Sequence, residues 1–218
     1  MKTTHENYLK AIYHLSPSET YLVATSAIAE QLTLSKSSAT EVAQELAVEG
    51  FVDYHRYQGV RLTAKGKKKA LQIIRSHRLW EVFLVEKLGF NWDEVHELAE
   101  ELEHIRNEKF IDSLEAFLAY PKRDPHGDPI PTKSGKLPLI PLRTLSDMKV
   151  GERGVLTQVE VDSEEFLQLL DKKKIAIGTL IEVCSIESFD DSISIQLDHR
   201  IVHLSNKAAS YLKLANEY

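Results

Sequence analysis

Proline spacing constrains the fold of this chain more than any other feature. Six of its seven prolines fall within residues 121–141. Proline at that density excludes a regular helix or a central strand, because each ring fixes φ and removes a backbone N–H. We therefore predict a linker over residues 121–141 that separates a mainly helical stretch from a shorter stretch after it.

The stretch after the linker has the pattern of a small β-rich domain. Short apolar runs such as residues 154–156 and 193–197 alternate with glycines, which is typical of strands joined by turns. One helix is expected from Ser163 to Leu170, because the Ser163 hydroxyl can cap it and two acidic residues follow in its positive first turn.

Cysteine and hydropathy patterns indicate the cellular compartment. Cys184 is the only cysteine, so the chain cannot form an intrachain disulfide, which fits a reducing environment. It lies in an apolar run, where a buried structural thiol is expected. No apolar run approaches the roughly 20 residues of a spanning helix, and the N-terminus lacks a signal-peptide core. We expect a cytoplasmic protein without membrane association.

Charge is distributed unevenly along the chain. The net charge of −6 argues against nucleic-acid binding when taken alone. However, residues 1–75 carry 10 Lys/Arg against 7 Asp/Glu, whereas residues 76–120 carry 4 against 11. Of these two segments, only the first has the net positive charge that attracts the DNA phosphates.

The basic segment has the pattern of a winged helix-turn-helix. A helix over residues 26–32, a tight turn and a helix that begins near Ser35 fit this motif, whose second helix enters the major groove N-terminus first. Residues 51–62 then alternate like two strands around a turn, as a wing would. Hydroxyl-rich turns are often plain helix caps, and the motif also occurs in proteins that bind no DNA. The order of these parts in the basic segment favours DNA binding.

Two groups of side chains are the candidates for DNA contacts. The base-facing candidates are Ser35, Ser37, Ser38, Thr40 and Glu41. The candidates for phosphate contacts, which need positive charge, are Lys36, Arg56, Arg61 and Lys67.

The acidic middle segment carries a His/Glu cluster from His96 to His104. On a helix, positions 96, 100, 103 and 104 fall within about 100° of one another, and His77 and Glu81 form an i,i+4 pair on the preceding helix. A divalent cation would remove the repulsion among these carboxylates. Carboxylate and imidazole ligands suit Mn²⁺ or Fe²⁺, and the lack of a thiolate argues against a soft metal. A solvated acidic helix is the alternative, but the whole set favours metal binding.

These motifs together resemble the diphtheria toxin repressor and manganese transport regulator family. The resemblance runs through residues 6–13, the helix-turn-helix with its wing, the middle His/Glu cluster and residues 125–131. It implies a mainly α fold with a small β domain. The implied domains are a winged helix-turn-helix over residues 1–73, a helical dimerisation and metal-binding domain with the linker over 74–141, and an SH3-like (FeoA-like) β-barrel over 142–218.

The resemblance also implies two sets of metal ligands. A primary site would consist of Asn7, Glu100, Glu103 and His104. An ancillary site would consist of His77, Glu81 and His96, with Asp162 and Glu165 from the SH3-like domain. A slip of one residue in the alignment of that loop would leave Glu160 or Glu164 instead.

Three positions bear on the choice of metal. Asn7 stands where manganese-type members have Asp and iron-type members Met, and its amide oxygen can ligate but brings no charge. Glu100 stands where iron-type members have Cys, which favours Mn²⁺ over Fe²⁺ on ligand hardness. Lys10 stands where the short manganese regulators have a second carboxylate, so their closely coupled two-metal site is not expected.

The expected function is transcriptional repression rather than catalysis. The resemblance implies a homodimer that binds palindromic operator DNA when loaded with Mn²⁺, or Fe²⁺ as the alternative, and controls metal-uptake genes. Metal would fix the spacing of the two DNA-reading heads. A di-iron enzyme would need a second copy of the E-x-x-H at residues 101–104, and a zinc protease would need His at position 100. A metal-independent DNA-binding protein with a partner-recruiting SH3-like domain is the remaining alternative.

Overall fold

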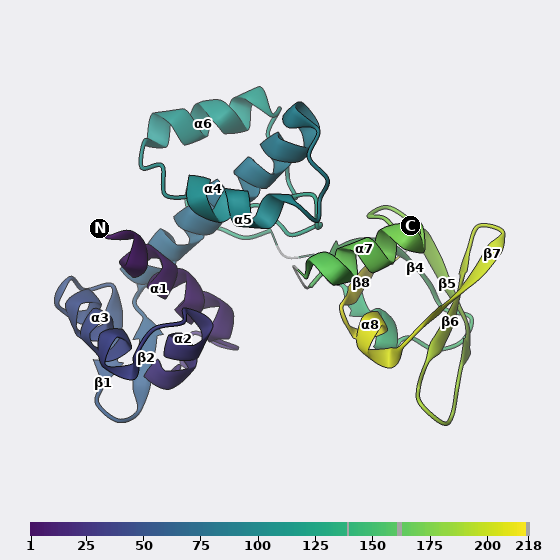
Figure 1. Cartoon of the computed structure of the whole chain (residues 1–218), viewed down its shortest axis with the longest axis horizontal. Coiled ribbons are helices and arrows are strands. Elements are labelled where there is room, and N and C mark those ends of the chain that lie inside the picture. Colours follow the sequence, from purple (N-terminus) through teal and green to yellow (C-terminus); the bar gives the residue numbers. More distant parts are fainter. Residues whose placement is uncertain (139, 161–162, 217–218) are drawn as a thin grey trace. The chain divides into compact units, whose positions relative to one another are not determined.

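The computed structural model describes residues 1–138, 140–160 and 163–216. The chain divides into two compact units, both drawn in Figure 1. The first unit comprises Met1–His77, Glu100–Ile111 and Pro131–Leu137, and the second comprises Arg78–Ala99, Asp112–Ile130 and Pro138–Tyr218. The division into three domains at residues 73 and 141 stays a prediction.

The first unit contains the predicted winged helix-turn-helix. Its elements are α1 (Thr3–Leu15), α2 (Thr25–Gln31), α3 (Lys36–Val48), β1 (Val52–His55) and β2 (Gly59–Leu62). The two strands pair antiparallel and form the wing. Helix α3 begins after Ser35, whose hydroxyl accepts a hydrogen bond from the Ser38 N–H at 3.1 Å, as expected of an N-cap.

An apolar core holds α1 against the other elements of this motif. Tyr8, Leu9 and Ile12 form one stripe of α1 and are fully buried, together with Leu46 of α3 and Val60 of β2. Each such side chain contributes roughly 1.5–3 kcal/mol when removed from water. Helix α1 is therefore an integral part of the helix-turn-helix core.

Three further helices follow the wing. They are α4 (Ala64–Leu88), α5 (Val95–Leu102) and α6 (Glu108–Phe117). The expectation of one helix from His96 to His104 is wrong at its end, because α5 stops at Leu102 and the last two residues lie in a turn closed by Ile105 N–H donating to the Leu102 carbonyl at 3.2 Å. Among the described residues, no helix combines the length and the hydropathy that crossing a membrane requires.

The second unit contains an antiparallel sheet with the strand order β3-β8-β4-β5-β6-β7. Its strands are β3 (Arg143–Thr144), β4 (Arg153–Val159), β5 (Leu180–Ile186), β6 (Ile193–Leu197), β7 (Arg200–Leu204) and β8 (Leu212–Ala215). The helical segments between these strands are η1 (Leu145–Asp147), α7 (Glu164–Lys172) and α8 (Asn206–Ser210). The small β domain is confirmed.

Two details of the β domain differ from the prediction. The expected cap at Ser163 is present on α7, but α8 is a second helix, which begins after a cap at Ser205. At five residues, α8 is too short for a periodic pattern to predict it. Cys184 is half-buried rather than buried, and it lies at a register shift between β5 and β6.

The proline-rich segment contains a tight turn that is fastened to β4. Asp124 Oδ1 accepts hydrogen bonds from the backbone N–H groups of His126 and Asp128, both at 2.9 Å. The His126 carbonyl in turn accepts from Val159 N–H at 2.9 Å. Gly127 has φ +87°, and a Cβ there would lie 1.9 Å from the Thr157 carbonyl oxygen. This part of the predicted linker is therefore a packed element of the second unit.

Two glycines of the helix-turn-helix allow a test of how closely the wing packs against the chain at Val23. In Gly59→Ala, the new Cβ would lie 2.4 Å from the Val23 carbonyl oxygen at φ +133°, so we expect a loss of about 3 kcal/mol or more in the free energy of unfolding. Gly50→Ala is the matched control, because Gly50 has φ +75° with nothing within 4 Å, and should lose only about 1 kcal/mol. Urea unfolding measures both, and equal losses would contradict the close contact.

Candidate metal centre

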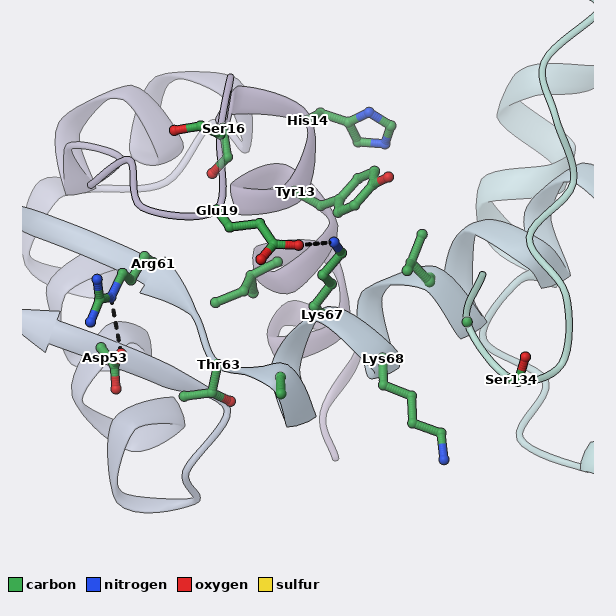
Figure 2. Close-up of a pocket in the computed structure, with 15 residues that line it drawn as sticks. Tyr13, His14, Ser16, Glu19, Asp53, Arg61, Thr63, Lys67, Lys68 and Ser134 are labelled. Atoms are coloured by element: carbon green, nitrogen blue, oxygen red, sulfur yellow. Dashed lines mark hydrogen bonds and ion pairs between the residues drawn. The ribbon is translucent and has the colours of Figure 1, made fainter. Parts of the chain in front are cut away.

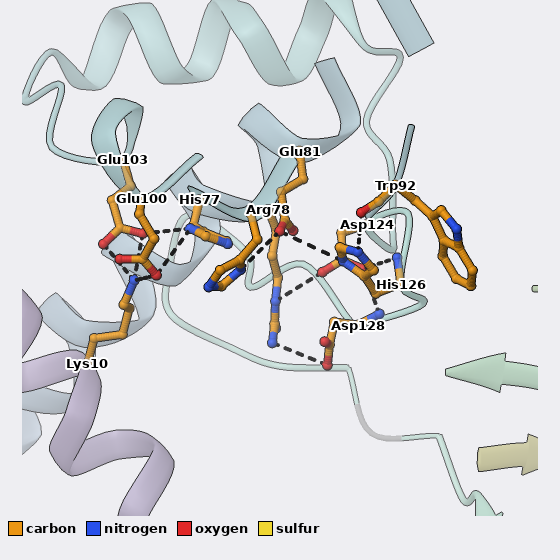
Figure 3. Close-up of polar contacts among 11 residues, drawn as sticks. Lys10, His77, Arg78, Glu81, Trp92, Glu100, Glu103, Asp124, His126 and Asp128 are labelled. Carbon is orange, nitrogen blue, oxygen red and sulfur yellow. Dashed lines mark hydrogen bonds and ion pairs between the residues drawn. The ribbon is translucent and has the colours of Figure 1, made fainter. Parts of the chain in front are cut away.

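Polar side chains from α1, α4 and α5 lie around Glu103, which follows the end of α5 in the first unit (Figure 3). The Glu103 side chain is fully buried. Its carboxylate lies 2.8 Å from Lys10 Nζ and 2.8 Å from His77 Nδ1, and His104 Nε2 is 3.7 Å away. Lys10 Nζ also lies 2.5 Å from Glu100 Oε1. Four of the predicted ligands and one lysine thus form a single cluster.

Glu6 extends this cluster along α1. Its carboxylate lies 2.7 Å from His104 Nδ1, 3.0 Å from Lys69 Nζ and 3.5 Å from Arg106 Nε. Burial by itself raises the pKa of Glu6, but the hydrogen bonds from His104 and Lys69 and the nearby positive charges outweigh it, so the pKa lies below its usual value. Glu6 is therefore a carboxylate at neutral pH and a further ligand candidate, which the sequence pattern did not indicate.

The residues present fit a hard divalent cation. Asn7 Oδ1 is buried and, within the described residues, has no hydrogen-bond partner. Such an atom costs roughly 1–3 kcal/mol, and it would gain a partner if it ligated a metal. Carboxylate, imidazole and amide donors together are the set that Mn²⁺ and Fe²⁺ accept.

A second cluster lies in the second unit and brings together Glu81, Asp124 and His126, all of them buried, with ligand atoms within 4.8 Å of one another. His126 Nδ1 lies 3.8 Å from Glu81 Oε1, and His96 Nδ1 lies 3.6 Å from the same oxygen. Arg78 Nε lies 3.3 Å from Asp124 Oδ2 and supplies a positive charge to the cluster (Figure 3). This donor set also fits a divalent cation.

The pKa values of Asp124 and His126 in the second cluster both lie above their usual values, so both groups hold their protons more tightly. Burial raises the pKa of Asp124 well above its usual value, and the charges of Glu81 and Asp128 raise it further. Burial by itself lowers the pKa of His126, but the hydrogen bond and charge of Glu81 and the charge of Asp124 outweigh it and raise the pKa to about 9. A bound cation could replace these protons.

The predicted ancillary ligands of the helical domain all have polar partners in the structure. His77 contacts Glu103 in the first cluster, whereas Glu81 and His96 lie side by side in the second. Asp124 and His126 were missed, since the prolines around them indicated only a linker. The signal available in the sequence was an acidic residue and a histidine two positions apart within a Pro/Gly turn.

The ligands predicted from the SH3-like domain stay untested. Asp162 lies outside the described residues. Glu165 is exposed and accepts a hydrogen bond from the Ser163 hydroxyl at 2.7 Å, which lowers its pKa. Of the two alternatives, Glu160 pairs with Lys213 at 2.9 Å and Glu164 accepts from Gln168 at 2.9 Å.

The base-facing DNA candidates lie at the start of α3. Ser35 and Ser37 are exposed, Ser38 is half-buried, and their hydroxyls are linked through Ser35 at 2.8–2.9 Å. Thr40 is half-buried and donates to the Lys36 carbonyl at 2.8 Å. The remaining candidates on this helix, Lys36 and Glu41, are exposed.

The other phosphate candidates differ in their surroundings. Arg56 is exposed at the tip of the wing, where its guanidinium lies over the Tyr57 ring. Arg61 donates to Asp53 at 3.0 Å, and Lys67 pairs with Glu19. Both pairs line a cavity of about 1030 Å³. Figure 2 shows their side chains. Arg61 and Lys67 would have to give up these partners to bind phosphate.

Comparison with known proteins matches three successive parts of the chain to three family models. Residues 1–60 match the iron dependent repressor, N-terminal DNA binding domain. Residues 63–132 match the iron dependent repressor, metal binding and dimerisation domain, and residues 143–215 match the FeoA domain.

Individual proteins show the same relationship. The HTH-type transcriptional regulator MntR of Oceanobacillus iheyensis is 37% identical over 119 residues, which cover 55% of this chain and 80% of that protein. A probable metal transport system membrane protein of Chlamydia trachomatis is 33% identical over 136 residues, or 60% of this chain, but the match spans only 30% of that longer protein.

A solved structure matches almost the whole chain. A manganese-dependent transcriptional repressor in complex with manganese is 34% identical, with a TM-score of 0.88 and coverage of 98% of this chain and 100% of that one. The fold and these matches define a metal-dependent regulator of the winged helix-turn-helix class. The chain belongs to the iron-dependent repressor family, of which the diphtheria toxin repressor and the manganese transport regulators are members.

The raised pKa of His126 predicts a pH dependence of stability in chelator. Its pKa is about 9 in the folded protein, against 6.5 when unfolded, so its stabilisation is complete below pH 6.5 and is lost as the pH rises through 9. His126→Gln should flatten the fall in the free energy of unfolding across this window by up to about 3 kcal/mol. The matched control is His199→Gln, at an exposed position. Identical slopes for wild type and His126→Gln would refute the shift.

Proposed function

We propose that this protein is a metal-dependent transcriptional repressor that binds palindromic operator DNA as a homodimer when loaded with Mn²⁺, and that it controls metal-uptake genes. Fe²⁺ is the alternative ion. The observation that carries the proposal is that the Glu103 cluster joins α1 of the helix-turn-helix to the turn after α5, through Lys10 at 2.8 Å and through Glu6 and His104 at 2.7 Å.

The primary ion would be held by Asn7, Glu100, Glu103 and His104, with Glu6 as a further donor. A divalent cation would supply two positive charges to carboxylates that repel one another. Mn²⁺ is supported by the all-N/O donor set and by the similarity to a manganese-dependent repressor in complex with manganese. The family name keeps Fe²⁺ as the alternative.

A second ion would be held by the Glu81–Asp124–His126 cluster. The predicted ancillary ligand His96 lies next to this cluster, 3.6 Å from Glu81. Asp162 and Glu165, the acids that the resemblance assigns to the SH3-like domain, remain proposed ligands of this second site. His77, which contacts Glu103, would support the primary site instead.

Helix α1 gives a physical route from the metal ligands to the DNA-reading helix. Its apolar stripe is buried in the same core as Leu46 of α3, and His5 Nε2 lies 2.7 Å from Glu45 Oε2 of α3. A change in how α1 is held at the Glu103 cluster therefore changes how α3 is held. Metal can favour DNA binding only through its preference for the DNA-competent arrangement.

The homodimer is supported by the exposed aromatic residues of α6. Phe117 is 65% exposed and Phe110 45% exposed, and exposed aromatic side chains are enriched at protein–protein interfaces. This helix lies within the matched metal-binding and dimerisation domain. The protein acts in this proposal as a cytoplasmic DNA-binding regulator and not as an enzyme.

An operator titration tests the proposed function. A duplex selected from a random-sequence library in the presence of Mn²⁺ should bind the protein at least about tenfold more tightly with Mn²⁺ or Fe²⁺ than in chelator, which corresponds to the usual range of coupling free energies. Fluorescence anisotropy measures the dissociation constants. Equal affinity in chelator would leave a metal-independent DNA-binding protein as the better description.

Glu103→Gln tests the primary site. Removing the buried charge should weaken Mn²⁺ binding by about 100-fold or more, because even indirect partners of metal ligands contribute 10–100-fold. Glu101→Gln is the matched control, because Glu101 is an exposed carboxylate on the last turn of α5, and it should bind Mn²⁺ like the wild type. Isothermal titration calorimetry measures both, and unchanged affinity in Glu103→Gln would exclude Glu103 as a ligand.

Lys36→Ala tests the assignment of phosphate contacts. The side chain is exposed in the first turn of α3, so its loss should weaken operator binding and reduce the slope of log K against log[salt] by about 1. Lys207→Ala, an exposed lysine on α8, is the control and should keep the wild-type slope. A wild-type slope for Lys36→Ala would remove Lys36 from the phosphate contacts.

A further inference from the structure

Lys10 lies where a cation between the primary-site carboxylates is needed. Its ammonium nitrogen is 2.5 Å from Glu100 Oε1, 2.8 Å from Glu103 Oε1 and 2.8 Å from Glu103 Oε2. The Lys10 side chain is only 13% exposed, and that of Glu103 is 0% exposed. Figure 3 shows the ammonium between the two carboxylates.

These contacts are more than a surface ion pair. A buried carboxylate is strongly destabilising unless a positive partner and further hydrogen bonds satisfy it. Lys10 supplies the positive partner, and His77 adds a hydrogen bond to Glu103 at 2.8 Å. In this arrangement Lys10 therefore supplies the positive charge that the buried carboxylate requires.

A metal held by both carboxylates would need the oxygens that Lys10 occupies. All three ammonium contacts fall on Glu100 and Glu103, both of which are proposed metal ligands. An ammonium ion and a divalent cation that contact the same carboxylates would repel each other strongly. The flexible four-carbon stem of lysine allows the ammonium to move toward solvent, where it is strongly hydrated.

We propose that Lys10 is an intramolecular competitor of the regulatory metal: its ammonium occupies the cation position between Glu100 and Glu103 and is displaced when a divalent cation binds. The inference rests on the proposed function. Lys10 thereby sets the metal concentration at which the primary site fills. The competitor is tethered, so its local concentration does not change when the metal concentration in the cell changes.

Removing the competing charge should tighten metal binding. In Lys10→Gln, we expect the dissociation constant for Mn²⁺ to fall by roughly 10- to 100-fold, since one elementary charge within about 4 Å of the site is lost. Lys10→Arg keeps the charge and should remain near the wild-type value. Lys2→Gln is the matched control, because Lys2 precedes the same helix but pairs with Glu45 at 3.1 Å, away from the ligands.

Calorimetry with Mn²⁺ alone, without DNA, is the first measurement, together with thermal unfolding in chelator. Lys10→Gln should melt at a lower temperature than the wild type in chelator, because Glu103 loses its counter-charge, and should gain more stability on adding Mn²⁺. Wild-type or weaker Mn²⁺ affinity in a folded Lys10→Gln overturns the inference alone. A wild type that binds no Mn²⁺ overturns the proposed function and the inference with it.

Acetylation of lysines with an amine-reactive ester is the second measurement and needs no variant. Lys10 should react slowly in chelator and several-fold faster with saturating Mn²⁺, as read by mass spectrometry of the peptides. Lys2, whose side chain is 71% exposed, should react equally in both states. Equal reactivity of Lys10 with and without Mn²⁺, in a protein that calorimetry shows to be loaded, would also overturn the displacement.

Discussion

The burial of Glu103 is the constraint around which the primary centre is organised. A carboxylate without exposure to water needs positive charge and hydrogen bonds from its neighbours, and Glu103 obtains them from Lys10 of α1 and His77 of α4. Elements distant in sequence must therefore be positioned correctly before the charge is satisfied. Satisfying the charge of Glu103 therefore holds these helices together. Replacing one cation at Glu103 by another would change the forces between them.

In the proposed function, metal binding and DNA reading both depend on one helix, α1. The polar face of α1 carries Glu6, Asn7 and Lys10, while its apolar face is buried with the recognition helix. Two functions on opposite faces of the same thirteen-residue helix require no long pathway of side chains between them. On this proposal, a small change in the position of α1 would reach α3 directly, because the two helices share one closely packed core.

Much of this arrangement could be predicted from the sequence, and the remainder depended on tertiary contacts. Periodic apolar residues and hydroxyl caps predicted the helix-turn-helix, and the His/Glu spacing indicated Glu100, Glu103 and His104 on one face. His77, which contacts Glu103, was expected in the ancillary site instead. The end of α5 at Leu102 was not predictable, because acidic helix formers continue past it. The roles of Asp124 and His126 depend on a turn that brings them beside Glu81, 43 residues or more earlier in the chain. The partners of Lys10 were hidden for the same reason.

The turn at residues 124–128 has a consequence for the modularity of the β domain. The backbone of β4 receives this turn at Thr157 and Val159, and the turn carries Asp124 and His126 to Glu81. The β domain therefore helps to position the Glu81–Asp124–His126 cluster, although these three residues precede it in the sequence. If this domain were exchanged for another of the same fold, the turn would be preserved only if the new strand approached Gly127 as closely as β4 does. The β domain is therefore not interchangeable with other domains of its fold.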